Sequence, residues 1–392
     1  MMPTFRFTTL LPLLAAAGLA YAPAVRAVSP PPDGGYANNN TAEGTDALLN
    51  VGFGANNTAV GFSALQNNSI GDYNTATGSK ALLSNINGSA NTAHGYNALS
   101  ANTIGIANTA TGKDALAVNT AGSVNTATGD VALVSNTTGS ANTANGVNAL
   151  ATNTTASSNT ADGYAALMTN SIGANNTASG ANALMNNSIG SNNIALGYQA
   201  GAELTTGDNN IAIGNTGVAG EAGNIRIGTR RTHNNTYIAG IFGSTITGGA
   251  AVMVDNKGRL GTVTSSARFK EGIRSMDKSS EALYSLEPVT FHYKKEFDPE
   301  GLAQFGLVAE QVAKVDPDLV ARDEDGKPYT VRYEAVNAML LNEFLKEHRK
   351  VAALEETVTE LKSALKEQAE QIRKVSNQLE VNQPVARVVS TK

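Results

Sequence analysis

The sequence predicts a mainly β chain, in which a parallel β-roll of repeats is followed by a small α+β domain that ends in a long helix. Two observations predict this: a strict 17-residue period over residues 40–214, and an abrupt change of composition after it. Only ten of the 175 residues from 40 to 214 are charged, whereas about a third of residues 265–380 are. No single globular domain combines these compositions, so we expect separate domains.

The repeat places Asn at eleven positions, from 40 to 210 in steps of 17. Its unit reads N-T-A-x-G-x-x-A-L and continues with a polar stretch and a second Gly, as in "NTATGSKALLSNINGSA" at 74–90. The third position is Ala and the fifth is Gly in all eleven copies. The ninth position is Leu in nine of ten copies, with Gly201 as the exception. A period this strict indicates stacked repeat units.

The residue types in the repeat favour strand over helix, because Gly, Asn and Thr have low helix propensity. A small residue at one fixed site suits a solenoid interior, where each coil stacks that side chain on its own copy. We expect the fixed Asn to bond to the Asn of the next coil and form a ladder. Each coil buries only about one Leu, worth roughly 1.5–3 kcal/mol, against the backbone entropy of 17 residues. The single roll is therefore expected to be marginal, and several chains are expected to share a Leu core.

The stretches "NNIALGYQAG" at 192–201 and "NNIAIGN" at 209–215 resemble the head repeats of trimeric autotransporter adhesins. The resemblance covers the whole repeat block and implies a left-handed parallel β-roll within a trimer.

The Thr column from Thr41 to Thr177 raises the alternative of an ice-binding face. However, the residue two positions on varies too much for a regular two-column array, so a β-favouring ladder is the better interpretation.

The N-terminal sequence predicts a secretory signal peptide over residues 1–27. Arg6 precedes an apolar run over 10–20 that is too short to span a bilayer, and "VRA" ending at Ala27 fits a small-x-small cleavage rule. "AYA" ending at Ala22 fits as well, but Pro23 disfavours cleavage there. No later segment is apolar enough to cross a membrane, so we expect a secreted or cell-surface protein.

Composition also excludes several kinds of site. The chain has no Cys, which removes disulfides and thiol catalysis, and its four His residues lie far apart in the sequence. We therefore expect no metal site and no cofactor. The net charge is −5 and no Lys/Arg cluster is present, so nucleic acid is not an expected partner.

After the repeats, short alternating segments predict strands and helices. "NIRIG", "TYIAGI" and "AVMVD" are typical of strands in a β-rich neck, with a turn at "DNKG". Further on, "KSSEALYSL" has helical spacing, "PVTFHYKK" alternates as a strand, and "QFGLVAEQVAKV" fits a strand that leads into a helix. "LVARDEDGKPYTVRY" predicts a hairpin around Asp325 and Gly326, and the chain is expected to be helical from Glu334 onward.

The last helix carries a heptad pattern with apolar residues at alternating spacings of three and four. Its positions are Val351, Leu354, Val358, Leu361, Leu365, Gln368, Ile372, Val375 and Leu379. The pattern predicts a coiled coil of about four heptads with one polar core position. The alternative is an amphipathic helix that packs on its own domain, but the narrow stripe with flanking Glu and Lys favours the coiled coil.

Residues 264–346 resemble the C-terminal intramolecular chaperone of phage endosialidase tailspikes, the peptidase S74 family, which also occurs in a membrane-bound myelin transcription factor. The matching pieces, in order, are "SSARFKEGI", "LEPVTFHYK", "QFGLVAEQV" and "YTVRYEAVNAMLLNEFLKEH". The resemblance implies a trimerising domain that cuts itself off, with Ser265 as nucleophile and Lys270 as its partner. Ser266 stands where many relatives have Asp.

The residue types of this pair also suit nucleophilic cleavage without reference to the family. A Ser hydroxyl needs a base, and Lys serves as one only when its amine is neutral, which requires burial or a nearby cation. Arg268 is a candidate supporting cation, although structural pairing is its favoured role. The cleaved bond is Thr264–Ser265 or Ser265–Ser266, and the first is preferred. Ser266 is a minor candidate for the nucleophile.

The expected function is that of an exported trimeric fibre or adhesin-like surface protein, whose C-terminal domain is a trimerisation chaperone and a self-cleaving serine peptidase of single turnover. Its partner is itself, as a homotrimer; a host or surface glycan or protein ligand is left unidentified. One alternative is a polysaccharide-binding or -degrading spike, which the repeats disfavour because they hold no paired carboxylates on a regular face. Another is an uncleaved adhesin with an inert dyad.

The expected organisation is a signal peptide (1–27), a Pro/Gly linker (28–39), the roll (40–214), the neck (215–263), the chaperone domain (264–346), the coiled coil (347–381) and a disordered tail (382–392).

Overall fold

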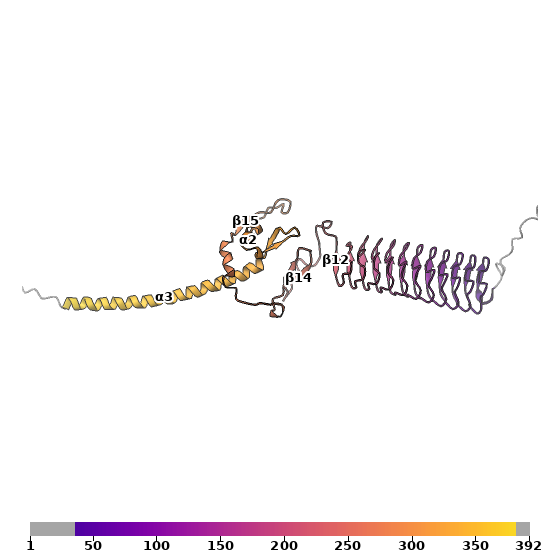
Figure 1. Ribbon diagram of the computed structural model, residues 1–392, viewed down its shortest axis with the longest axis horizontal. Coiled ribbons are helices and arrows are strands. Elements are labelled where there is room, and N and C mark those ends of the chain that lie inside the picture. The colour runs from indigo at the N-terminus through magenta and orange to yellow at the C-terminus, as the bar shows by residue number, and fades with distance from the viewer. Residues whose placement is uncertain (1–35, 382–392) are drawn as a thin grey trace, which may run out of the picture. The chain divides into compact units, whose positions relative to one another are not determined.

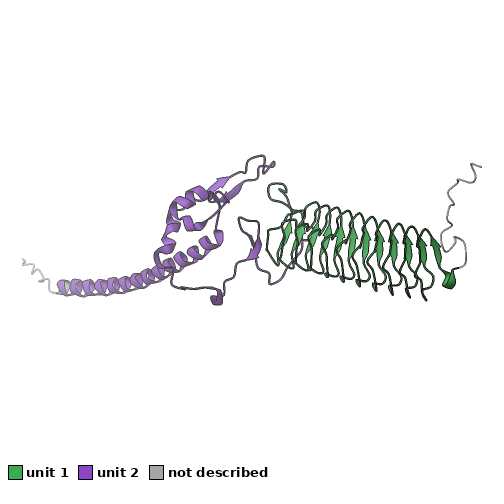
Figure 2. Cartoon of the chain, turned by 45° about the vertical axis from the view of Figure 1, so that its right-hand side comes forward, with its two compact units in different colours: residues 1–239 green, residues 240–392 purple. Residues whose placement is uncertain are grey.

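The computed structural model describes residues 36–381, so the predicted signal peptide, most of the linker and the C-terminal tail lie outside the described residues. The chain forms two compact units, divided between Ala239 and Gly240 (Figure 2). The division falls inside the segment predicted as a neck. Among the described residues, no helix has the length and apolar character that crossing a membrane requires.

The first unit is a parallel β-solenoid, which confirms the predicted fold class. A short 3-10 helix, η1 (Ala37–Asn39), precedes twelve three-residue strands that pair in chain order (Figure 1). Successive strands pair with an offset of 17 residues, as Ala110 with Ala127 does, up to the eleventh strand. The strands are β1 (Thr41–Glu43), β2 (Thr58–Val60), β3 (Thr75–Thr77), β4 (Thr92–His94), β5 (Thr109–Thr111), β6 (Thr126–Thr128), β7 (Thr143–Asn145), β8 (Thr160–Asp162), β9 (Thr177–Ser179), β10 (Ile194–Leu196), β11 (Ile211–Ile213) and β12 (Ile225–Ile227).

The invariant Ala and Gly of each coil allow the backbones of neighbouring coils to lie close together. The middle Ala of each strand from β1 to β11 is buried, and the two residues beside it face outward. The fifth residue must be Gly, since Gly112 has φ +133° and a Cβ there would lie 2.4 Å from the carbonyl oxygen of Gly129 in the next coil. The coils therefore stack closely enough to exclude any side chain at this position.

Two columns of buried Asn run through the solenoid, of which the sequence analysis predicted one. In the predicted ladder, Asn108 Nδ2 donates to Asn91 Oδ1 at 3.1 Å and to the carbonyl oxygen of Gly122 at 2.9 Å. Its Oδ1 accepts the backbone N–H of Asn125 at 3.0 Å. The second column uses the twelfth residue of the unit in eight coils, from Asn68 to Asn187. Both ladders satisfy polar groups that the coil interior removes from water.

The expected Leu core shared between chains is wrong. The ninth-position Leu side chains are fully or almost fully buried within their own chain, from Leu48 to Leu184. Every one of them adopts a left-handed backbone, with φ between +49° and +52°. Such a φ costs an L-residue roughly 1–2 kcal/mol, whereas burying a Leu contributes roughly 1.5–3 kcal/mol. Burial therefore outweighs the strain, and the backbone turns the Leu inward.

The tenth coil shows how this core tolerates its exception. Gly201 replaces the ninth-position Leu, and Leu204 replaces the Asn of the second ladder and is itself fully buried. The Leu side chain has thus moved by three residues within the same coil. Asn187 lies one coil before Leu204, and its Nδ2 donates to Asn170 Oδ1 at 3.0 Å, but no Asn of the next coil donates to its own Oδ1. Its Oδ1 is the one buried side-chain acceptor without a hydrogen bond in the part of the chain that the structure describes.

The solenoid ends with a charged residue. β12 pairs with β11 at an offset of 14 residues and places Arg226 level with Ala212, at the end of the buried Ala column. The guanidinium forms an ion pair with Glu221, with Nη2 and Oε2 2.6 Å apart. An Arg at this position covers the last coil and prevents another Ala from stacking on it, which is how terminal repeats close a solenoid.

The second unit is small and mixed. Its strands pair as three antiparallel hairpins, and the hairpin around Asp325 and Gly326 is as predicted. No strand forms at "TYIAGI" (236–241), contrary to prediction, because no partner strand lies beside it. The elements are β13 (Val252–Val254), β14 (Leu260–Thr262), η2 (Ala267–Phe269), η3 (Asp277–Ser285), β15 (Val289–Phe291), β16 (Gln304–Gly306), α2 (Ala309–Val315), η4 (Pro317–Leu319), β17 (Val320–Arg322), β18 (Pro328–Val331) and α3 (Tyr333–Val381).

This unit has a modest core. Six buried apolar side chains make it up, contributed by α2, η4, the β17–β18 hairpin and the first turns of α3: Val312, Leu319, Val320, Val331, Val336 and Met339. The predicted helix at "KSSEALYSL" forms as the 3-10 helix η3, which packs beside α3. The rest of α3 continues past this core as a single long helix (Figure 1).

Candidate functional site

The predicted Ser–Lys pair lies together in the structure. Ser265 follows β14, and Lys270 directly follows the short 3-10 helix η2. The turn is closed by backbone bonds from Phe269 N to Ser266 O at 3.1 Å and from Lys270 N to Ala267 O at 3.0 Å. It brings Lys270 Nζ to 3.3 Å from Ser265 Oγ. This distance suits proton exchange between a nucleophile and a base. The distance between two such groups is often slightly long before a substrate is engaged.

The neighbouring candidates take different positions. The Arg268 guanidinium lies 4.6 Å from the centre of the Phe269 ring, a cation–π contact. Ser266 precedes η2 with extended backbone, and its side chain makes no capping bond. Thr264 supplies the carbonyl next to Ser265 and, like its neighbours, is exposed. The structure thus pairs Ser265 and Lys270, while Arg268 packs on Phe269.

The pair is open to solvent in the single chain. Every residue from 256 to 275 is exposed. A Lys amine acts as a base only where burial or a neighbouring cation favours its neutral form. A single chain therefore brings the hydroxyl and the amine within reach of each other but leaves both side chains exposed to solvent.

A polar cluster that the sequence does not predict forms around the buried side chains of Ser280 and Glu343. Ser280 is fully buried and donates to a carboxylate oxygen of Glu343. Asn342 Nδ2 donates to Ser280 Oγ at 2.6 Å, Tyr284 OH donates to Glu343 Oε2 at 2.6 Å, and Lys346 Nζ lies 2.6 Å from Glu343 Oε1. The five residues join η3 to α3 across more than 55 positions of sequence. No sequence motif links them, although Asn342, Glu343 and Lys346 share one face of a predicted helix.

The electrostatics of this cluster favour the ionised carboxylate. Hydrogen bonds from Lys346, Ser280 and Tyr284 lower the pKa of Glu343 to about 2. The same contact raises the pKa of Tyr284 to about 12, chiefly because its hydroxyl donates to Glu343. Lys346 also lies 3.3 Å from Ser280 Oγ, but it is engaged in the ion pair with Glu343. We therefore assign the cluster a structural role, which is to hold η3 on α3.

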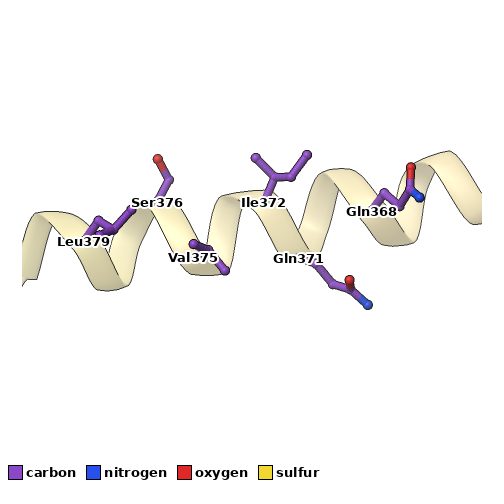
Figure 3. Close-up of a pocket in the computed structure, with 6 residues that line it drawn as sticks. All are labelled: Gln368, Gln371, Ile372, Val375, Ser376 and Leu379. Carbon is purple, nitrogen blue, oxygen red and sulfur yellow. The ribbon is translucent and has the colours of Figure 1, made fainter.

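The predicted coiled-coil positions form an uncovered apolar stripe on α3. The eight apolar members, from Val351 to Leu379, are 46–70% exposed, so the helix does not pack on its own domain there. Figure 3 shows one end of this stripe, where Ile372, Val375 and Leu379 project from the helix beside two Gln side chains. An amphipathic helix folded against its own domain is thereby excluded for this segment.

Residues 265–321 match the model of the Peptidase S74 family, described as the chaperone of endosialidase. The match begins at Ser265 and covers η2, η3, the β15–β16 hairpin, α2 and the start of β17. It confirms the resemblance that the sequence indicated for this segment. No curated protein and no solved structure matches the chain. The combination of a β-solenoid with an S74 chaperone domain is that of a fibre-like or spike-like protein.

Within residues 36–381, no group of three or more His, Cys, Asp or Glu side chains lies close enough together to hold a metal ion. What the arrangement offers is a hydroxyl, an amine and an adjacent peptide carbonyl at the first residue of the S74 match.

Proposed function

We propose that this chain is an exported fibre protein whose S74 domain assembles three copies and then releases itself by cutting the chain at Ser265. The observation that carries the proposal is the 3.3 Å approach of Lys270 Nζ to Ser265 Oγ at the start of the family match. The solenoid provides the fibre. Export is supported by the signal-peptide pattern over residues 1–27.

The proposed reaction uses the peptide bond on the N-terminal side of the nucleophile. Lys270 Nζ accepts the hydroxyl proton while Ser265 Oγ attacks the carbonyl carbon of Thr264, and the proton passes to the departing Ser265 nitrogen. The product is an ester between Thr264 and the Ser265 side chain. Water then hydrolyses it, which leaves a carboxylate on Thr264 and restores the Ser265 hydroxyl behind a new N-terminal amine.

Assembly supplies the control in this proposal. Ser265 and Lys270 are exposed in one chain, and so is the apolar stripe of α3 in the same unit. Parallel association of three helices along that stripe would bury its apolar residues. In this proposal, the assembled chaperone domains also shield the Ser265–Lys270 pair from solvent. Cleavage therefore follows trimerisation and leaves a kinetically trapped fibre.

The test is the intact mass and denaturing-gel pattern of the signal-less chain beside Ser265→Ala and Lys270→Ala. We expect wild type to give two fragments, the second beginning at Ser265, and both variants to remain full length. Ser266→Ala is the matched control for the hydroxyl, and Lys278→Ala, an exposed Lys outside the pair, is the control for the amine. Both controls should be cut like wild type.

The contrary outcomes are distinct. A wild-type chain that is folded, trimeric and uncut would mean that the S74 domain is a permanent trimerisation cap, and the fibre would be an unprocessed adhesin. Efficient cleavage in a chain kept monomeric would refute the dependence on assembly. Glycan-degrading activity in purified fibre would instead favour a polysaccharide-degrading spike.

A further inference from the structure

The outward face of the solenoid sheet changes character at one coil boundary. In each strand, the first and third residues point outward. The first is Thr in all nine strands from β1 to β9 and becomes Ile194, Ile211 and Ile225 in β10 to β12. The third is mostly polar through Ser179 and becomes aliphatic at the same boundary. Both outward columns thus switch together between β9 and β10.

The six aliphatic residues form a single block, which we call the aliphatic patch: Ile194, Leu196, Ile211, Ile213, Ile225 and Ile227. They stand in register on three adjacent strands. Five of them are 36–70% exposed, and the sixth, Ile211 in the middle strand, is half-buried. The patch holds no charge, whereas the same third-residue column carries Glu43, His94 and Asp162 on earlier coils. An uncharged aliphatic block on a polar sheet face is typical of a contact surface.

The chain itself indicates which partner would cover this patch. The exposed heptad stripe of α3 calls for further copies of the same helix in parallel, as the proposed function requires. Copies joined in parallel about a common axis bring identical residues to the same level. The patch of one copy would then stand level with the patch of the next. Six side chains form a small contact, so the helix contact brings the copies together first and the patch then aligns them.

The patch also resolves an ambiguity that the repeats create. Along β1 to β9 the outward Thr column is the same on every coil, so it does not distinguish a slip of one coil between two rolls. The slip is recognised only where the column changes, because it sets Ile194 and Leu196 opposite the polar residues of β9. A slipped pair would leave aliphatic surface uncovered at one end and would bury hydroxyl groups without partners at the other. The aliphatic patch is thus the feature of this sheet face that distinguishes one register from another.

We propose that the aliphatic patch on β10–β12 meets the same patch on neighbouring copies and fixes the register in which the rolls align. This inference rests on the proposed function, since it takes the partner to be a second copy held in parallel. It adds the surface that keeps the rolls aligned after the S74 domain has left.

The first test uses single Cys substitutions, which are unique because the chain has none of its own. Ile213→Cys lies in the middle of the patch, and Thr128→Cys is its match in the same column on β6. A disulfide needs Cα atoms within about 7 Å, so we expect Ile213→Cys chains to join about tenfold faster than Thr128→Cys chains on a non-reducing gel. Mild oxidation of the full signal-less chain is sufficient.

The second test does not depend on sulfur geometry. Ile213→Lys places like charges opposite each other across the proposed contact, and Thr128→Lys is the control. We expect the released roll of Ile213→Lys to dissociate at a concentration about tenfold or more above that of wild type, while Thr128→Lys matches wild type. Light scattering of the fragment measures the association, and circular dichroism checks that the roll is folded.

The outcomes separate this inference from the proposed function. Preferential joining of Ile213→Cys in a chain that is never cut supports the patch and refutes release at Ser265. A trimer that is cut normally, but in which the residue-213 variants behave like their residue-128 controls, refutes the patch alone. A wild-type chain that is monomeric at all concentrations refutes both.

Discussion

The solenoid and the C-terminal unit bury their apolar side chains in opposite ways. In the solenoid, each ninth-position Leu and each strand Ala is covered by its own chain, so a coil needs only its neighbours. In the C-terminal unit, six residues form a core while the whole stripe of α3 remains exposed. The sequence predicts that both the roll and the coiled-coil helix associate with other copies. In the structure, the roll covers its own apolar side chains, whereas the stripe of α3 is left exposed.

The largest expected effect contrasts a Leu from each region. Leu116→Ala should destabilise the solenoid by about 3 kcal/mol, because it removes a fully buried side chain and leaves a cavity between coils. Leu361→Ala, on the exposed stripe of α3, should change the unfolding free energy of a single chain by less than about 0.5 kcal/mol. Denaturant unfolding of uncut Ser265→Ala chains at low concentration measures both.

The order of the two effects should reverse when self-association is measured in place of unfolding. Leu361→Ala should weaken self-association of the chain, while Leu116→Ala should leave it intact wherever the solenoid is folded. A Leu361→Ala chain that associates like wild type would mean that the stripe is not the contact between copies. Equal destabilisation by both substitutions would contradict the contrast between the regions.

The next effect concerns the buried Asn ladder. Asn108→Ala should cost about 2 kcal/mol, because it leaves the Asn125 N–H without a partner inside the coil and removes one of the two Asn donors to the Gly122 carbonyl. Asn67→Ala is the control, since Asn67 Oδ1 accepts a hydrogen bond between coils from Asn50 Nδ2 at the surface, outside both ladders. A similar loss of stability in both variants would show that ladder bonds contribute equally inside and outside.

The roll could be predicted well because a strict repeat places each residue against its own copy. Strand positions, the first Asn ladder and the interior Ala column follow from that alone. The direction of the Leu side chain could not be predicted, since it depends on a left-handed backbone that Leu rarely adopts. The second Asn column had a signal, a recurrence at the twelfth position in eight coils, but Asn is so common in turns that the sequence analysis assigned it to the polar stretch.

The site was predictable where its residues are close in sequence. Ser265 and Lys270 are five positions apart, and a single turn of chain brings them together. Ser280 and Glu343 are 63 positions apart, and their contact depends on how η3 packs on α3. Long-range polar contacts of this kind leave no period or spacing in the sequence. The polar cluster could therefore be found only in the folded chain.

That cluster gives the C-terminal unit an expected pH dependence. The pKa of Glu343 falls from 4.5 to about 2 on folding, so the carboxylate stabilises the fold above pH 4.5, and this contribution is lost as pH falls from 4.5 towards 2. The pKa of Tyr284 rises from 10 to about 12, so its contribution is present below pH 10 and is lost as pH rises towards 12.

The measurement is the urea midpoint of the C-terminal unit at pH 5 and at pH 3. We expect Glu343→Gln to be less stable than wild type at pH 5 and to lose less stability between the two pH values. Glu356→Gln, an exposed change further along α3, should keep the acid dependence of wild type. An acid dependence that survives in Glu343→Gln would assign it to other carboxyl groups.

The smallest net change in unfolding free energy is expected in the tenth coil, where Leu204 already compensates for the missing Leu at position 201. Gly201→Leu alone should destabilise, because its Cβ would lie 2.8 Å from Leu184 Cδ2 and 3.2 Å from Leu204 Cδ1, and overpacking costs roughly 1–3 kcal/mol. Leu204→Asn alone should destabilise by opening a cavity. The double variant restores the residue types of the other coils, gives Asn187 Oδ1 a partner and should unfold within about 1 kcal/mol of wild type. Additive losses in this double-mutant cycle would mean that Gly201 and Leu204 are independent and that the Leu has not simply moved within its coil.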